Sequence, residues 1–165
     1  MINSRVYVFQ NLQDIATENT LVQKRSPVKV IDCQLKQVFD MRLMPTTKKD
    51  DPPNSPSGVR VNYAITEVNH RVFLYGGINA QNEVLECMDV FDAQTYKMHK
   101  VKYRLDYKPR GRQAAACIAV DKQTMLVIGG SFETGFCSLQ PVPANDCVQI
   151  FDPDASTWRK LTVQD

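Results

Sequence analysis

The sequence contains no long hydrophobic run and no recognisable targeting segment. It has no stretch of 18 or more apolar residues in its 165 positions, so it predicts no membrane-spanning helix. The opening stretch, MINSRVYVFQN, lacks the longer apolar core and the small-residue cleavage site of a signal peptide. We therefore expect a cytoplasmic protein without membrane contact, with the cytoskeleton and the nucleus left open as further locations.

Metal-ligating residues are also scarce. The chain has two histidines, His70 and His99, and five cysteines with no CxxC pair among them. A structural zinc site needs four closely spaced Cys or His ligands, so the sequence predicts no metal and no cofactor. An odd number of widely spaced cysteines is typical of an intracellular protein with reduced thiols. The formal net charge of +2 creates no overall field that would attract nucleic acid, and none is expected as a partner.

What the sequence does contain is an internal repeat. Gly58–Gly77 aligns without a gap with Gly111–Gly130, at an offset of 53 positions. Each copy has an apolar run, a short polar turn, a second apolar run and a diglycine. This order is typical of a β-hairpin. A partial third copy, Arg5–Phe9, matches Arg71–Tyr75, but Gln10-Asn11 replaces the diglycine and no room is left upstream for a first strand.

A second motif occurs three times at a spacing of 60 positions. It has an aspartate after an apolar run, then turn-forming residues, then an apolar residue six positions beyond the aspartate. The aspartates are Asp32, Asp92 and Asp152, and the later apolar residues are Val38, Met98 and Trp158. Each copy predicts two strands joined by a tight turn, in which the aspartate accepts hydrogen bonds from the turn itself.

These motifs together resemble the kelch repeat. That family combines an apolar strand ending in Gly-Gly, an aromatic-Asp-Pro turn, and a Trp six residues after the Asp. The third copy matches it fully, the second has Met98 in place of the Trp, and the first keeps only Ile31-Asp32. The residues that match the structural motif are Gly76, Gly77, Asp92, Met98, Gly129, Gly130, Asp152 and Trp158. The resemblance implies an all-β fold of antiparallel four-stranded blades arranged around a channel as a β-propeller.

On this interpretation the chain, residues 1–165, is an incomplete propeller of about 2.75 blades, whereas propellers have 4–8. Blade one would span residues 5–44 without its first strand, blade two 58–105 and blade three 111–163. An apolar face would be exposed at each end of the row, so other chains or missing residues are needed to close the ring. We favour a fragment of a longer polypeptide.

The connecting segments vary in length, and the longer ones belong to one face of the predicted propeller. From Gly129 to Asp152 there are 23 positions, against 16 from Gly76 to Asp92. Insertions on one face of a repeat protein often form its binding face. Its arginines would suit an acidic peptide, through bidentate hydrogen bonds. The predicted partner contacts are Lys48, Lys49, Asp50, Asn54, Arg110, Arg112, Phe132, Glu133, Phe136 and Gln140.

A basic stretch follows the second aspartate motif. Between Lys97 and Arg112 there are seven Lys or Arg residues and one acidic residue, Asp106. Nucleic-acid binding is one interpretation. The first three cations, however, fall on a predicted outer strand, where lysines commonly prevent edge-to-edge association. We favour this protective role.

The sequence thus predicts a non-enzymatic scaffold that binds a partner protein or peptide. Kelch modules occur in cytoskeletal or ciliary assemblies and as substrate adaptors of ubiquitin ligases, so the resemblance implies one of these settings. The alternative is a propeller enzyme, an oxidase or a sugar isomerase, with its active site on blades absent from this chain. No pairing of nucleophile and base, or of two carboxylates, recurs here at a spacing that would favour the alternative.

Overall fold

The computed structural model describes residues 5–9, 28–40, 60–79, 81–104, 107–134 and 141–161. Their regular structure is antiparallel β-sheet, as predicted, and none of the sheets closes on itself. The helical element among them is one short 3-10 turn, η3 (Ala144–Asp146). No helix in this part of the chain combines the length and the apolar character needed to cross a bilayer.

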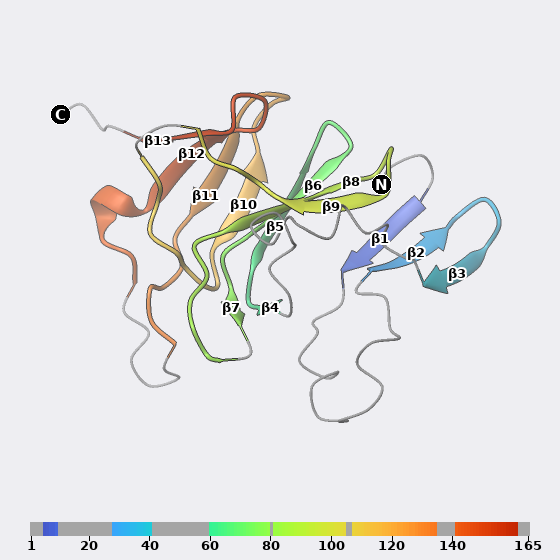
Figure 1. Ribbon diagram of the computed structural model, residues 1–165, viewed down its shortest axis with the longest axis horizontal. Helices are drawn as coiled ribbons and strands as arrows, with labels where there is room; N and C mark the ends of the chain where they lie inside the picture. Colours follow the sequence, from blue (N-terminus) through green and yellow to red (C-terminus); the bar gives the residue numbers. More distant parts are fainter. Residues whose placement is uncertain are drawn as a thin grey trace, which may run out of the picture.

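Three sheets lie side by side in chain order (Figure 1). Sheet one consists of β1 (Arg5–Phe9), β2 (Val28–Asp32) and β3 (Gln37–Asp40). Sheet two consists of β5 (Ala64–Val68), β6 (Arg71–Tyr75), β8 (Met88–Asp92) and β9 (Lys97–Lys100). Sheet three consists of β10 (Ala116–Ala119), β11 (Met125–Ile128), β12 (Val148–Asp152) and β13 (Thr157–Lys160). A small fourth sheet pairs β4 (Arg60–Val61) with β7 (Ile78–Asn79).

The strand boundaries follow the sequence repeats. β2, β8 and β12 begin and end 60 positions apart, and so do β3, β9 and β13. β1 lies 66 positions before β6, as its sequence match predicts. The described part of sheet one has three strands, in the order β1-β2-β3. One prediction needs correction: the run before β5 is not continuous, because Asn62 adopts a φ of 54° and separates β4 from β5.

The three aspartate turns have the same hydrogen bonds. In each turn the aspartate Oδ1 accepts the backbone N–H groups two and three residues later, at 2.8–3.2 Å. The residue four positions after the aspartate has a positive φ in each case: 50° for Lys36, 56° for Tyr96 and 55° for Ser156. The predicted role of the aspartates is confirmed.

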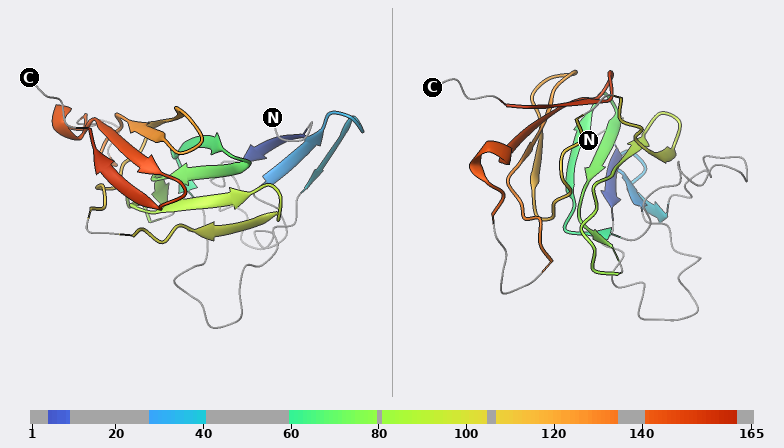
Figure 2. Two further views of the ribbon diagram at one scale, coloured as in Figure 1. Left: turned by 90° about the horizontal axis from the view of Figure 1, so that it is seen from above. Right: turned by 60° about the vertical axis from the view of Figure 1, so that its left-hand side comes forward.

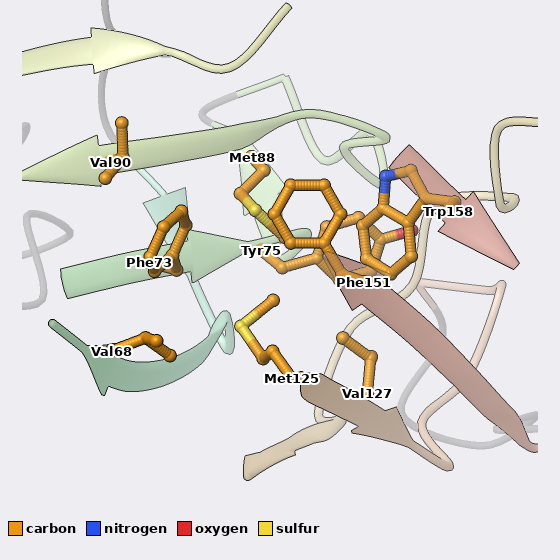
Figure 3. Close-up of a cluster of buried hydrophobic side chains, with 9 residues drawn as sticks. All are labelled: Val68, Phe73, Tyr75, Met88, Val90, Met125, Val127, Phe151 and Trp158. Atoms are coloured by element: carbon orange, nitrogen blue, oxygen red, sulfur yellow. The ribbon is translucent and has the colours of Figure 1, made fainter. Parts of the chain in front are cut away.

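Sheet two is buried on both faces. Consecutive residues of a strand point to opposite faces of the sheet, and β6 and β8 each contain four consecutive buried residues. Phe73 and Tyr75 of β6 pack on sheet three, in a cluster with Phe151 and Trp158 (Figure 3). The Tyr75 and Trp158 rings lie 5.0 Å apart, and the Phe151 and Trp158 rings 4.7 Å. Such tilted aromatic pairs add stability beyond the area that they bury. Trp158 therefore packs between sheets two and three.

The opposite face of sheet two packs on sheet one. Val72, Leu74 and Phe91 form a second buried cluster with Val28 and Val30 of β2. Tyr7 and Phe9 of β1 complete it, with ring centroids 5.4 and 5.6 Å from that of Phe91. Met98, in the position of Trp158, packs against this cluster. Sheet two therefore joins its neighbours through two separate cores, and the row of sheets seen in Figure 2 depends on it.

The diglycine Gly76-Gly77 allows the link that precedes sheet three to approach sheet two closely. Gly76 and Gly77 have φ angles of 68° and 87°, and the Gly77 N–H donates to the Arg112 carbonyl at 2.9 Å. A Cβ on Gly76 would lie 2.1 Å from that same carbonyl oxygen. Gly129 has a nearly identical φ of 66°, but a Cβ there would meet no atom within 4 Å.

The two glycines form a matched pair for mutation. We expect Gly129→Ala to lower the free energy of unfolding by about 1–2 kcal/mol, the cost of a left-handed conformation for a residue with a Cβ. Gly76→Ala should lower it by a further ~1–3 kcal/mol, because its Cβ also collides with backbone. Urea denaturation followed by the fluorescence of Trp158, the single tryptophan, measures both. Equal destabilisation by the two substitutions would contradict the close approach at Gly76.

Candidate partner-binding surface

Among the described residues, the segments that lead into sheets two and three and those between the middle strands of these two sheets lie at one end of the molecule, here called the loop end. It carries β4 and β7 (Figure 1). Gln113 and Ser131 exchange two backbone hydrogen bonds of 2.9 Å, and the Asn82 amide donates to the Thr134 hydroxyl at 3.3 Å. The tight turns within the hairpins lie at the opposite ends of the strands, here called the hairpin end. The described loops thus gather on one face.

Two buried arginines brace the loop end from inside. Arg60 is 4% exposed, donates to the carbonyls of Leu74 and Gly76, and pairs with Asp89 at 2.5 Å. Arg112 is 1% exposed and donates to the carbonyls of Gly129 and Asp146, both at 3.1 Å. Each arginine therefore binds a carbonyl of a diglycine segment and connects it to the preceding link.

The two arginines differ in their partners. Asp89, which is 1% exposed, supplies a carboxylate to Arg60, whereas the residue 60 positions later is Gln149. Gln149 donates to the Asp146 carbonyl and accepts a hydrogen bond from the Tyr107 hydroxyl at 2.6 Å. The Nε of Arg112 has no hydrogen-bond partner among the described residues. Sequence reasoning missed the ion pair, although a carboxylate inside the apolar run Met88–Phe91 was a usable signal.

The exposed part of the loop end carries an arginine stacked on an aromatic ring. The Arg110 guanidinium carbon lies 4.5 Å from the centroid of the Phe132 ring, and that of Arg112 lies 5.5 Å from it. Arg110 is exposed, while its backbone carbonyl accepts a hydrogen bond from Tyr75 at 3.2 Å. Cation–π stacking holds a guanidinium in place while leaving its N–H groups for a ligand.

The predicted contacts therefore have different outcomes. Arg110, Phe132 and Glu133 lie together at the loop end, with the Glu133 carbonyl accepting a hydrogen bond from the Gln113 side chain. Arg112 lies beside them but is buried, because its guanidinium serves the Gly129 and Asp146 carbonyls; it supports the surface from below. The other predicted contacts lie outside the described residues: Lys48, Lys49, Asp50, Asn54, Phe136 and Gln140.

Burial shifts the pKa values of titratable groups beneath this surface. Burial raises the pKa of the Cys117 thiol to about 12, against a smaller opposing effect of Arg112. Burial likewise raises the pKa of the Tyr75 phenol. The four cysteines that the structure describes are free thiols, as predicted. Within the described ranges, no group of three or more His, Cys, Asp or Glu side chains is arranged to hold a metal ion.

Removal of the buried Asp89 carboxylate should lower the free energy of unfolding far more than removal of a surface carboxylate. Asp89→Ala leaves the Arg60 charge buried without its counter-ion, and we expect a loss of about 3–5 kcal/mol in the free energy of unfolding. Glu86→Ala is the matched control, because Glu86 pairs with Lys108 where both side chains are about half exposed. It should cost less than ~1 kcal/mol. Similar urea midpoints for the two variants would show that the Arg60 pair is not a buried brace.

Thiol labelling tests the environment of Cys117. Because burial raises the pKa of this thiol, very little of it is present at pH 8 as the thiolate, the form that reacts. Cys33 lies exposed in the first aspartate turn. With iodoacetamide and peptide mass spectrometry, we expect Cys33 to be modified first and Cys117 to be modified only after unfolding in urea. Equal rates of modification of Cys33 and Cys117 in the folded protein would contradict the buried environment of Cys117.

Comparisons with known proteins identify no family for this chain. No protein-family model matches the sequence, and no curated protein matches it either.

Proposed function

We propose that this chain is part of a kelch-type β-propeller and acts as a non-enzymatic scaffold that binds a partner protein through its loop end. The main observation behind the proposal is the exposed Arg110 side chain stacked on the half-buried Phe132 ring. Arginine and aromatic residues dominate the binding energy of many protein interfaces, especially where the scaffold holds them in place. The Tyr75 hydrogen bond and the buried Arg112 provide that support here.

The equivalent packing of successive sheets supports the propeller part of the proposal. Val72 and Phe91 of sheet two face sheet one, and their repeat counterparts Met125 and Phe151 of sheet three face sheet two. A contact that recurs between successive pairs of sheets is expected of propeller blades. It agrees with the kelch resemblance of the sequence motifs.

Exposed apolar side chains on the two outer faces of the row are a second reason to propose further sheets. Val38 of sheet one occupies the repeat position of Trp158 and is 64% exposed, against 5% for the tryptophan. On sheet three, Ile118 is 48% exposed in a cross-strand row with Leu126 and Ile150. We propose that additional blades, from a longer polypeptide or from other chains, cover these apolar faces. The kelch resemblance points to a cytoplasmic role, as part of a cytoskeletal or ciliary assembly or as a ubiquitin-ligase substrate adaptor.

Peptide selection on the immobilised chain tests the loop-end surface. Phage-displayed random peptides that bind the full chain should be enriched in Asp and Glu, because carboxylates complement the free N–H groups of Arg110. We expect Arg110→Glu and Phe132→Ala to weaken the selected peptides about tenfold or more, the effect of losing one interface anchor.

The matched control changes the same charge at the hairpin end. Lys122 is exposed in the β10–β11 turn, where its backbone carbonyl accepts a hydrogen bond from Asn69. Lys122→Glu should leave the affinity of these peptides within about twofold of the wild type, since the site is far from the loop end. If Lys122→Glu weakened binding as much as Arg110→Glu, or if no peptide were selected, the loop end would not be the partner site.

A further inference from the structure

A groove of about 710 Å³ runs along the outer edge of sheet two, away from the loop end. β9 and the segment that follows it, residues 101–104, form one side. The turn between β12 and β13 forms the other, through Pro153 and Ser156. The two sides are joined where the Arg104 N–H donates to the Ser156 carbonyl at 2.9 Å. The groove therefore lies between β9 and a turn of the next sheet that is about fifty residues later in the chain.

The floor of the groove follows directly from the strand register. Phe73, Val90 and His99 are cross-strand neighbours on β6, β8 and β9, and so are Arg71, Asp92 and Lys97. Cross-strand neighbours point to the same face of a sheet. The floor thus consists of one row with two buried apolar side chains and one row of charged side chains.

The lining is strongly cationic. Its lining residues include five Lys or Arg against a single acidic residue: Arg71, Lys97, Lys100, Lys102 and Arg104 against Asp92. The strand register places the Lys100 side chain on the opposite face of sheet two, so four of these cations belong to the groove face or to the segment after β9. The Asp92 Oδ1 already accepts two backbone hydrogen bonds of its own turn. Arg71 pairs with Asp154 at 2.5 Å, where Asp154 is about half exposed. The excess of positive charge within one groove favours an anionic occupant.

β9 is an edge strand of sheet two, so one side of its backbone faces outward. The Val101 N–H donates to the Met88 carbonyl at 2.8 Å. In an antiparallel ladder hydrogen-bonded positions alternate, so Lys97 and His99 also direct their backbone groups to β8. The backbone N–H and C=O groups of Met98 and Lys100 therefore point to the outer side, with the spacing that an added strand requires.

We propose that this groove binds an extended acidic segment of a partner protein, which pairs with the outer edge of β9 and places its carboxylates among the lysines. A volume of about 710 Å³ accommodates several residues and greatly exceeds a single phosphate group. Backbone pairing supplies affinity in such strand addition, and alternate side chains supply specificity. The lysines that discourage self-association of the edge thereby select an acidic strand.

The aromatic residues of the groove favour a peptide over a single-stranded nucleic acid. Binding of the latter requires exposed rings on which bases can stack. Phe73 is buried against Phe151, and the Tyr103 ring packs edge-on against Phe151 and Trp158. These two rings are thus engaged within the protein, and the exposed His99 imidazole alone gives no platform for successive bases. The surface is separate from the Arg110–Phe132 stack, so this inference does not depend on the function proposed for the loop end.

Fluorescence anisotropy on the full chain tests the proposal with a labelled decapeptide of alternating Glu and Thr. We expect saturable binding that weakens as salt increases, and at least tenfold weaker binding to the double variant Lys97→Glu/Lys102→Glu. Lys122→Glu, the same charge change at a distant turn, and Arg110→Glu at the loop end should each remain within twofold of the wild type. Thermal unfolding of each variant verifies that the fold is retained.

Two further probes distinguish strand pairing from charge attraction alone. The same decapeptide with every backbone nitrogen methylated cannot donate to β9, and we expect its affinity to fall at least tenfold. Equal binding of the methylated peptide, or no effect of the Lys97/Lys102 double variant, would overturn the proposal. Tighter binding of a ten-residue oligothymidylate than of the acidic peptide, with the same dependence on Lys97 and Lys102, would instead assign the groove to nucleic acid and overturn it as well.

Discussion

The structure depends on the two-sided burial of sheet two. Its strands place alternate side chains into separate cores, with Phe73 and Tyr75 against sheet three and Val72 and Leu74 against sheet one. Burial of a large apolar side chain contributes about 1.5–3 kcal/mol, so each core gives a strong energetic reason for the sheets to stack. The diglycine before β7 is a consequence of this stacking, since a side chain at Gly76 would keep the Arg112 backbone from approaching.

Stacked sheets create two different ends. At the hairpin end the aspartate turns are short and satisfied by their own hydrogen bonds, and they vary little from copy to copy. At the loop end, carbonyl groups that leave the ladders must find other donors, because an unpaired buried carbonyl is costly. Arg60 and Arg112 supply those donors from inside. Because these buried arginines support the loops from below, we expect that Arg110 and Phe132 can be substituted without loss of the underlying geometry.

The charges of the molecule therefore fall into two classes with different physics. The Arg60–Asp89 pair is shielded from water and insensitive to salt, and its removal affects stability. The lysines of the β9 groove are exposed, contribute little to stability, and are screened by salt over about 8–10 Å. In the strand addition proposed above, their effect is on the choice of partner, whereas the buried pair acts on stability.

Local features of the fold were predictable from the sequence, because neighbouring residues determine them. The aspartate turns and the 60-residue register of β2, β8 and β12 follow from contacts within a few residues or from alternation along a strand. The burial of Arg112 was not predictable in this way. Its two carbonyl acceptors come from Gly129 and Asp146, 17 and 34 residues away, and an arginine in a polar segment otherwise suggests an exposed contact. The β9 groove likewise exists only because Pro153 and Ser156 lie beside a strand fifty residues earlier. Local hydrogen bonds and hydrophobic periodicity specify which segments become strands and turns, and both can be read from neighbouring residues. Which charges are buried and which line a groove depends instead on the distant backbone groups that packing brings to each side chain.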